Sequence, residues 1–212
     1  MCDVRTLGVT GGIGSGKSSV CGYLEDLGAT IFKADRVARD LMESSEQVRE
    51  AVIQLFGRKS YKRDGQLDRH WLATQVFNDE ASLANLNAIV HPRVAEAFDR
   101  RKQQLSSGLL IHEAALIYEA GLADRLDAVC VVSAPKDVRT ERVMARDGIS
   151  AGEVRARMQR QLPQGETEGR ADVVLVNAGD QAELCRKTKK LYELAMDQEV
   201  LRPENFRLFR RL

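Results

Sequence analysis

The chain has 212 residues, of which 43% are hydrophobic, and 32 Lys and Arg residues nearly balance 31 Asp and Glu residues, which leaves a formal net charge of +1. This length favours one substantial core, with room for an inserted subdomain, over two independent domains. The charge balance argues against a protein that coats nucleic acid and against an acidic, solvating protein. Because neither a secretory signal nor an apolar run of membrane-spanning length is visible, we expect a cytoplasmic protein without nucleic-acid or membrane partners.

Short apolar segments alternate with longer helical patterns along the chain, which predicts an α/β fold with a parallel sheet. Residues 17–28 carry apolar side chains at helical spacing and end at Gly28, so we expect a helix there. Residues 36–106 contain helical patterns without a convincing strand and are interpreted as a helical insertion. The five expected strands cover residues 5–10, 29–33, 109–114, 128–134 and 172–177.

Residues 11–18, called here the phosphate loop, read GGIGSGKS and match the pattern GxxxxGK[ST] between the first expected strand and the first expected helix. Glycines let backbone N–H groups approach phosphate oxygens, where an inward Cβ would obstruct the anion. The start of the helix adds a partial positive charge. The pattern therefore predicts a site for a nucleoside triphosphate. The residues expected to bind it are Gly12, Gly14, Ser15, Gly16, Lys17, Ser18 and Ser19.

ATP and Mg²⁺ are the expected cofactors of this loop. Lys17 should reach the β and γ phosphates, and the Ser18 hydroxyl should bind Mg²⁺. Glu113, at the end of the third expected strand, is placed to hold a water bound to the same ion. The chain lacks the NKxD pattern with which GTPases read guanine, and motor ATPases normally need more chain. A small-molecule kinase fits best.

Asp35 follows the second expected strand, at the edge of the sheet where open α/β proteins bind ligands. A kinase needs a carboxylate there to accept the proton of the acceptor hydroxyl or to orient it, so Asp35 is a candidate catalytic base. The alternative is that Asp35 caps the following helix, and its position alone does not decide. His112, beside Glu113, is expected to be a structural histidine.

Seven segments carry a resemblance to bacterial dephospho-CoA kinases over essentially the full chain. They are TGGIGSGKSSV (10–20), ADRVAR (34–39), DGQLDRHWLATQVF (64–77), LNAIVHPRV (86–94), ALIYEAGL (115–122), ERVMARDGIS (141–150) and ADVVLVNAG (171–179). The first is shared by all P-loop kinases, whereas DGxLDR and the His-Pro pair are far more specific. The resemblance implies a P-loop NTPase fold in a single kinase domain (1–212). It also implies a five-stranded parallel sheet flanked by helices, a helical CoA-substrate insertion (58–107) and a helical lid (136–165).

The resemblance further implies that the γ-phosphate of ATP passes to the ribose 3′-hydroxyl of dephospho-CoA, giving CoA and ADP in the last step of CoA synthesis. Asp35 matches the candidate base of the family, and Lys17, Arg142 and Arg146 complete the implied catalytic set, with Arg146 favoured on the RDG pattern. Arginines of such a lid can bridge migrating phosphate oxygens. Most of the six in this segment are nevertheless expected to lie on its solvated face: Arg139, Arg142, Arg146, Arg155, Arg157 and Arg160.

The implied acceptor contacts are spread along the chain: Thr10, Asp35, Arg69, His91, Pro92 and Glu119. For His91 and Pro92 an alternative stays open, with Pro92 at the first position of a helix and His91 as a turn residue before it. Lys33 stands where the family usually has an acid. That departure keeps a regulator of the same fold without turnover as a competing hypothesis, and a kinase for another small acceptor is a third.

The last twelve residues, 201–212, are basic with interleaved phenylalanines. We expect the phenylalanines to pack on the core while the arginines face water. A monomer or a weak homo-oligomer is expected.

Overall fold

The computed structural model describes residues 3–76, 79–197 and 211–212. The chain forms two compact units. The sheet unit consists of Met1–Phe32 and Leu105–Leu212, and the helical unit consists of Lys33–Gln104. The phosphate loop therefore belongs to the sheet unit.

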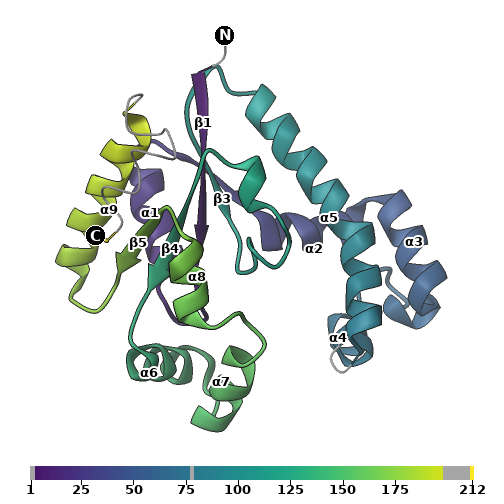
Figure 1. The fold of residues 1–212 in the computed structure, drawn as a ribbon. Coiled ribbons are helices and arrows are strands. Elements are labelled where there is room, and N and C mark those ends of the chain that lie inside the picture. The colour runs from purple at the N-terminus through teal and green to yellow at the C-terminus, as the bar shows by residue number, and fades with distance from the viewer. Residues whose placement is uncertain (1–2, 77–78, 198–210) are drawn as a thin grey trace. The chain divides into compact units, whose positions relative to one another are not determined.

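A five-stranded sheet has the strand order β2-β3-β1-β4-β5, with parallel pairing of β1 to β3, β1 to β4 and β4 to β5 (Figure 1). The strands are β1 (Asp3–Thr10), β2 (Thr30–Lys33), β3 (Ser107–Glu113), β4 (Ala128–Ser133) and β5 (Val173–Val176). The predicted α/β class and its five parallel strands are confirmed, with boundaries that differ by at most two residues. Since β1 is the central strand, the phosphate loop leaves the sheet at the carboxyl edge, where such folds bind ligands.

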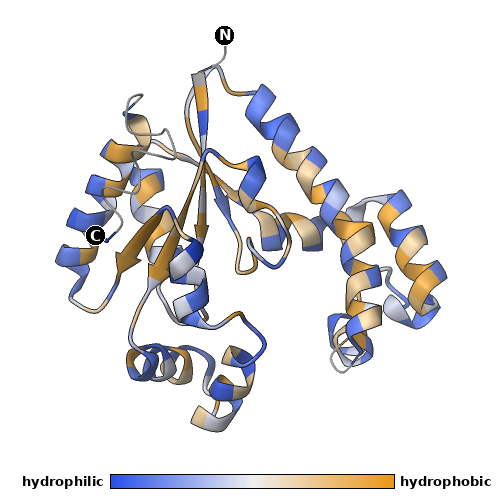
Figure 2. Ribbon diagram, in the orientation of Figure 1, coloured by the Kyte–Doolittle hydropathy of each residue, from blue (hydrophilic) through white to orange (hydrophobic). Residues whose placement is uncertain are grey.

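Helices of the sheet unit cover a sheet in which β4 and β5 are apolar along most of their length (Figure 2), as parallel strands buried on both faces are. They are α1 (Lys17–Asp26), α6 (Lys136–Asp147), α7 (Ala151–Met158), α8 (Gln164–Arg170) and α9 (Gln181–Met196), with a 3₁₀ turn at Ala123–Arg125. The helix predicted before Gly28 is confirmed as α1. α1 and α9 lie side by side against the sheet (Figure 1).

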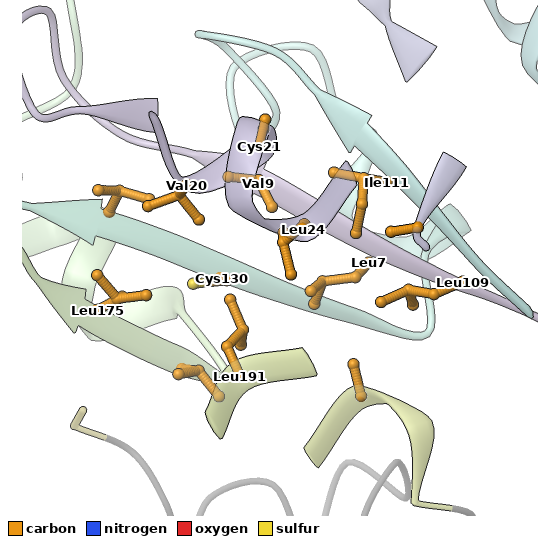
Figure 3. Packing of buried hydrophobic residues seen from close by; sticks show 14 of the residues in the cluster. Leu7, Val9, Val20, Cys21, Leu24, Leu109, Ile111, Cys130, Leu175 and Leu191 are labelled. Atoms are coloured by element: carbon orange, nitrogen blue, oxygen red, sulfur yellow. The ribbon is translucent and has the colours of Figure 1, made fainter. Parts of the chain in front are cut away.

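In the core of the sheet unit, α1 and α9 pack with residues of β1, β3, β4 and β5 (Figure 3). Leu24 of α1 and Leu191 of α9 are fully buried and pack with Leu7 of β1, Cys130 of β4 and Leu175 of β5. Burying a leucine side chain stabilises the fold by about 2 kcal/mol. The start of α1, and with it the end of the phosphate loop, is therefore anchored by the packing of its second half.

The last two residues of the chain pair with β5. The Leu212 N–H donates to the carbonyl of Val174 (2.9 Å), and the Val176 N–H donates to the carbonyl of Leu212 (3.0 Å). The side chain of Leu212 packs against the core. The prediction for the phenylalanines of the tail concerns residues 201–210, which lie outside the described residues.

The helical unit contains α2 (Ala34–Ser44), α3 (Glu46–Phe56), a 3₁₀ turn (Arg58–Ser60), α4 (Arg69–Val76) and α5 (Glu80–Gln103). α2, α3 and α4 all pack on α5, whose buried residues Leu86, Val90, Val94 and Phe98 repeat at every fourth position. None of the helices in the described ranges is both long and apolar enough to cross a membrane.

α5 continues through Pro92 without ending. The alternative in which Pro92 starts a helix and His91 is a turn residue is therefore wrong. Pro92 is exposed, so water can reach the carbonyl group that the missing proline N–H leaves without a partner. The buried stripe runs through Val90 and Val94 on either side, and this continuous packing outweighs the local preference for a break.

Candidate active site

The backbone of the phosphate loop follows a path that side chains would block. Gly11 and Gly14 have φ values of +145° and +79°, which residues with a Cβ rarely adopt. A Cβ on Gly11 would collide with the carbonyl oxygen of Val132, and one on Gly14 would lie 2.5 Å from the carbonyl oxygen of Arg139. The glycines are thus required by the backbones of β4 and α6 as well as by the conformation of the loop.

The end of the loop joins a lysine, a helix start and a carboxylate. α1 begins at Lys17, so the positive end of the helix dipole lies at the end of the loop, where it favours an anion. The Lys17 ammonium donates to the carbonyl of Gly11, at the other end of the loop. Ser18 Oγ donates to Glu113 Oε1 across 3.4 Å. The structure therefore brings the two predicted metal ligands together beside the predicted phosphate site.

Ser18 and Glu113 fit a magnesium ion that is shared with substrate phosphates. Both offer oxygen atoms, the ligand type that Mg²⁺ prefers, and in kinase sites this ion usually takes one or two protein ligands and completes its shell with water and phosphate. Within the described ranges, no group of three or more His, Cys, Asp or Glu side chains is arranged to hold a metal. The donor set therefore suits a phosphate-bound Mg²⁺.

A hollow of the sheet unit, called here the loop hollow, is lined by Ile13 to Ser19 of the loop and by Arg142 and Arg146 of α6. Lys17 lies in this set, so three cations and the backbone N–H groups of the loop surround one space. Such an arrangement favours a ligand with several negative charges. The predicted catalytic residues Lys17, Arg142 and Arg146 are thereby brought together.

Arg142 is half-buried and bonded to Asn177, the residue that follows β5. Its Nη1 donates to the carbonyl oxygen of Asn177 (3.3 Å) and its Nη2 donates to Asn177 Oδ1 (3.4 Å). The opposite end of the same amide, Nδ2, donates to the carbonyl oxygen of Ser15 (2.8 Å). Asn177 therefore connects α6 to the phosphate loop.

Arg146 is held differently, by an exposed carboxylate. Its Nε and Nη2 donate to Asp147 at 2.7 and 3.0 Å, and Arg157 of α7 donates to the same carboxylate at 3.0 Å. The hydrogen bonds from Arg146 are the main cause that lowers the pKa of Asp147, and they raise the pKa of Arg146. Because exposed ion pairs contribute little to stability, Arg146 can exchange Asp147 for another anion at small cost.

Thr10 and Glu119, two predicted acceptor contacts, line a second hollow of the sheet unit. Thr10 Oγ1 donates to the carbonyl of Ala115 (3.3 Å), and the Glu119 carboxylate accepts the N–H of Leu162 (3.2 Å). Further lining residues are Gly11, Gly12, Lys136, Arg139, Arg155, Met158, Gln159, Gln161, Pro163, Gln164 and Thr167. The start of the loop and the segment after α7 therefore form opposite parts of one space.

Arg139 and Gln161 connect that segment to the loop. Arg139 is 9% exposed, and its Nη1 occupies the space that a Cβ on Gly12 would need. Burial lowers the pKa of Arg139, and the charge of Glu168 partly offsets this. Gln161 Oε1 accepts the N–H of Ile13 at 2.8 Å. Arg139 is thus buried, and unlike Arg157 it does not belong to the solvated face.

Asp35 belongs to the helical unit and is exposed in the first turn of α2. The helix begins at Ala34 and its N-cap residue is Lys33. The alternative in which Asp35 caps the helix is therefore wrong, because the helix already includes Asp35. Its charge still suits the positive end of the helix dipole.

The other predicted acceptor contacts of the helical unit lie on two helices. Arg69 is exposed at the start of α4, with its Nη2 3.9 Å from a carboxylate oxygen of Glu43. His91 is half-buried in α5, and burial lowers its pKa. Pro92 is exposed beside it. Their role as acceptor contacts stays a prediction.

His112 is buried in β3, where its ring lies 5.4 Å from the ring of Phe32. Burial, with a smaller effect from Arg125, lowers its pKa to about 4. It is a neutral structural residue at physiological pH, as expected from the sequence.

Comparisons with known proteins show the family of this chain. A model of the family described as dephospho-CoA kinase matches residues 5–183. The chain belongs to the dephospho-CoA kinase family. A dephospho-CoA kinase from Salinibacter ruber is 48% identical over 192 residues, which cover 89% of this chain and 96% of that relative.

Solved structures are similar to this family member over most of their length. The structure of TT1252 from Thermus thermophilus has a TM-score of 0.82 and 35% sequence identity, and the match covers 92% of this chain and 99% of that one. A dephospho-CoA kinase from Campylobacter jejuni has a TM-score of 0.64 and 25% identity, with coverage of 90% and 96%. The P-loop kinase fold is thereby confirmed.

Two residues of this kinase were missed in the sequence, Asn177 and Gln161. Asn177 offered a signal, because it is a polar residue directly after a buried strand that ends at the same edge of the sheet as the loop. Gln161 offered none, since it lies in a short connection after α7 and its contact with Ile13 depends on tertiary packing.

Proposed function

We propose that this protein transfers the γ-phosphoryl group of ATP to the ribose 3′-hydroxyl of dephospho-CoA, giving CoA and ADP. Membership of the dephospho-CoA kinase family supports the reaction and the use of ATP. The structural observation that supports it most is the loop hollow, in which the phosphate loop, Lys17 and two arginines surround one space.

Phosphoryl transfer needs positioning and charge neutralisation more than covalent chemistry. The 3′ oxygen bonds to the γ phosphorus while the bond from that phosphorus to the β–γ bridging oxygen breaks. The N–H groups of the loop and Lys17 bind the β and γ phosphates. Arg142 and Arg146 bind the oxygens that gain negative charge as ADP departs.

Ser18 and Glu113 would hold Mg²⁺ in this proposal, which their 3.4 Å separation and oxygen chemistry support. When bound, the ion neutralises charge on the β and γ phosphates. The two residues come from the first turn of α1 and the end of β3, so the packing of the core determines their separation.

Asp35 accepts the proton of the 3′-hydroxyl in this proposal. It is an exposed carboxylate directly after β2, within the family segment ADRVAR. The acceptor contacts Thr10, Arg69, His91, Pro92 and Glu119, the insertion 58–107 and the lid 136–165 stay predictions. The same holds for the cytoplasmic location and the monomeric or weakly oligomeric state.

ADP release from ATP and Mg²⁺, measured with and without dephospho-CoA, tests the reaction. We expect release to depend on the acceptor, and Asp35→Asn to lower its rate by about 10²-fold, as the loss of a general base does. Asp40→Asn is the matched control, because Asp40 is an exposed aspartate of the same helix. It should leave the rate unchanged. Lys17→Ala should reduce both nucleotide binding and turnover.

Two outcomes would contradict the proposal. Wild-type protein that binds ATP but releases no ADP with the acceptor present would favour a nucleotide-binding regulator, and Lys33 would then be the first residue to change to an acid. Turnover with another small alcohol but not with dephospho-CoA would reassign the acceptor.

A further inference from the structure

Asn177 makes contacts with three separate parts of the sheet unit. Its side-chain Nδ2 donates to Ser15 inside the loop, and its Oδ1 and backbone carbonyl both accept from Arg142 of α6. Its own backbone N–H donates to the carbonyl of Ser133 at the end of β4 (2.7 Å). One residue thus contacts the sheet, the phosphate loop and α6.

The side chain of Asn177 fits closely against the loop. A Cβ on Gly16 would collide with Asn177 Nδ2, so the amide occupies the space that the glycine leaves. Asn177 is only 5% exposed. Its side-chain partners, Ser15 and Arg142, both line the loop hollow.

The neighbouring backbone keeps Asn177 in place. The carbonyl of Val176 accepts from the Lys187 ammonium of α9 (2.8 Å), and the N–H of Val176 donates to Leu212. The residue before Asn177 is thus bonded on both of its backbone groups. The amide of Asn177 projects from a fixed point of the sheet.

We propose that Asn177 is a positioning residue that fixes Arg142 and the phosphate loop relative to each other, so that both meet the phosphates of one nucleotide. This rests on the proposed function only in taking the ligand of the loop hollow to be a nucleotide. A preorganised pair of binding groups loses less freedom when the ligand binds. Loss of the amide should therefore weaken nucleotide binding even though Asn177 does not line the loop hollow.

The two ends of the amide can be separated by substitution. Asn177→Asp keeps an oxygen that accepts from Arg142, but places a second carboxylate oxygen against the carbonyl of Ser15 in place of a donor. Asn177→Ala removes both side-chain contacts and leaves only the backbone carbonyl for Arg142. If the contact with the loop matters more, Asn177→Asp should be impaired at least as much as Asn177→Ala.

Equilibrium binding of ADP with Mg²⁺, in the absence of acceptor, is the decisive measurement. We expect Asn177→Ala to raise the Kd about tenfold, the usual effect of losing a buried hydrogen bond to a fixed partner. In steady-state assays the KM for ATP should rise, while the KM for dephospho-CoA should stay unchanged.

A double-mutant cycle tests whether Asn177 acts through Arg142. In an Arg142→Ala background, Asn177→Ala should raise the Kd only about threefold, because one of its two partners is already gone. An equal factor in both backgrounds would overturn the link between the two residues.

Thr188→Val is the matched control for a purely structural effect. Thr188 is a fully buried polar residue of α9 whose hydroxyl donates only to the carbonyl of Leu184 in its own helix. The control should lower the melting temperature and leave the Kd for ADP unchanged. If Asn177→Ala also lowers only the melting temperature, the positioning role is wrong.

The failure of this inference can be told apart from failure of the proposed function. Wild-type protein that binds no nucleotide would contradict both. Asn177 variants that bind ADP as tightly as the wild-type protein does would contradict the positioning role alone. Binding that falls with Asn177→Ala in a protein without acceptor-dependent turnover would support the role and contradict the reaction.

Discussion

The phosphate loop and the arginine segment, residues 139–157, line the same hollow but are held in opposite ways. The loop contacts buried neighbours, largely through backbone: Val132, the Arg139 carbonyl and the Asn177 amide fill the spaces beside its glycines. The arginine segment ends in exposed ion pairs, such as Arg146 and Arg157 with Asp147. The loop is a fixed receptor, whereas Arg146 and Arg157 can exchange Asp147 for another anion.

This difference matches the order of events in phosphoryl transfer. A fixed loop binds phosphates that are present before the reaction, at little cost in freedom. Arginines that leave weak surface partners can follow charge that develops only as the phosphoryl group moves. Arg142 belongs to both regions, because it comes from the arginine segment but is tied to the loop by Asn177.

The largest expected effect is that of removing an arginine, Arg146. Arg146→Ala should lower kcat by about 10³-fold, in the range known for arginines that stabilise phosphoryl transfer, and change the Kd for ADP much less. Arg157→Ala is the control, because Arg157 shares Asp147 but does not line the loop hollow. Steady-state kinetics beside equilibrium binding checks this. A fall in binding as large as the fall in kcat would show that Arg146 belongs to the fixed receptor.

A substitution on the loop side should have the reverse signature. Gly16→Ala should raise the Kd for ADP by about 10²-fold, because φ is +98° there and the new Cβ would displace the Asn177 amide. Gly22→Ala, in the next turn of α1, meets nothing within 4 Å. It should instead stabilise the fold by about 1 kcal/mol, since alanine favours helix. Calorimetric binding and thermal unfolding of both variants give the result, and equal affinity in the two would contradict a rigid loop.

As the pH falls, the sheet unit should lose stability before the carboxylates of the arginine segment are protonated. The pKa of His112 is about 4 in the fold and 6.5 unperturbed, so the unfolded chain binds more protons, and stability that is complete above pH 6.5 falls as the pH decreases toward 4. The loss is roughly 3 kcal/mol at about 1.4 kcal/mol per pH unit. Hydrogen bonds from Arg146 lower the pKa of Asp147, and a hydrogen bond from the Ser150 backbone lowers the pKa of Glu153. Those two carboxylates therefore keep their charge over most of this pH range.

His112→Phe should remove this acid limb from a plot of unfolding free energy against pH. The exposed His70 provides the control, as His70→Gln. Urea unfolding at several pH values between 4 and 7 measures the slope. An unchanged slope in His112→Phe would mean that another group takes up the proton.

The smallest expected effect is that of changing Asp147, the carboxylate that pairs with Arg146 and Arg157. Asp147→Asn should change the free energy of unfolding very little, because the pairs are exposed. It should change kcat/KM by about threefold at most, with less effect at high salt. A larger loss would show that Arg146 is fixed by Asp147 in its working position.

Much of the sheet unit could be predicted because its signals are local. The expected strands are short apolar segments, and the loop is recognised by its glycines between a strand and a helix. The meeting of Ser18 with Glu113 followed from parallel strands that end at one edge. The contacts of Arg139 and Gln161 with the loop could not be predicted, because each depends on the packing of elements more than a hundred residues away in sequence. The contact of Asn177 was missed although its place directly after a buried strand gave a signal.

The helical unit shows the opposite error, in which a local rule was overruled. The preference of proline for the start of a helix suggested a boundary at Pro92, yet α5 continues because its buried face repeats through that position. Asp35 is a similar case, since α2 begins at Ala34 and already includes the residue that the alternative made its cap. Both rejected alternatives rested on the preference of a single residue for a helix terminus.

The neighbours of the loop glycines also restrict how the sequence can drift among relatives. Gly11 and Gly14 face main-chain carbonyls, which no substitution elsewhere can remove, so these positions should be invariant. Gly16 faces a side chain, that of Asn177. The φ of +98° at Gly16 also disfavours any residue with a Cβ, whatever space position 177 leaves, so position 16 should stay glycine even in a lineage that shortens position 177.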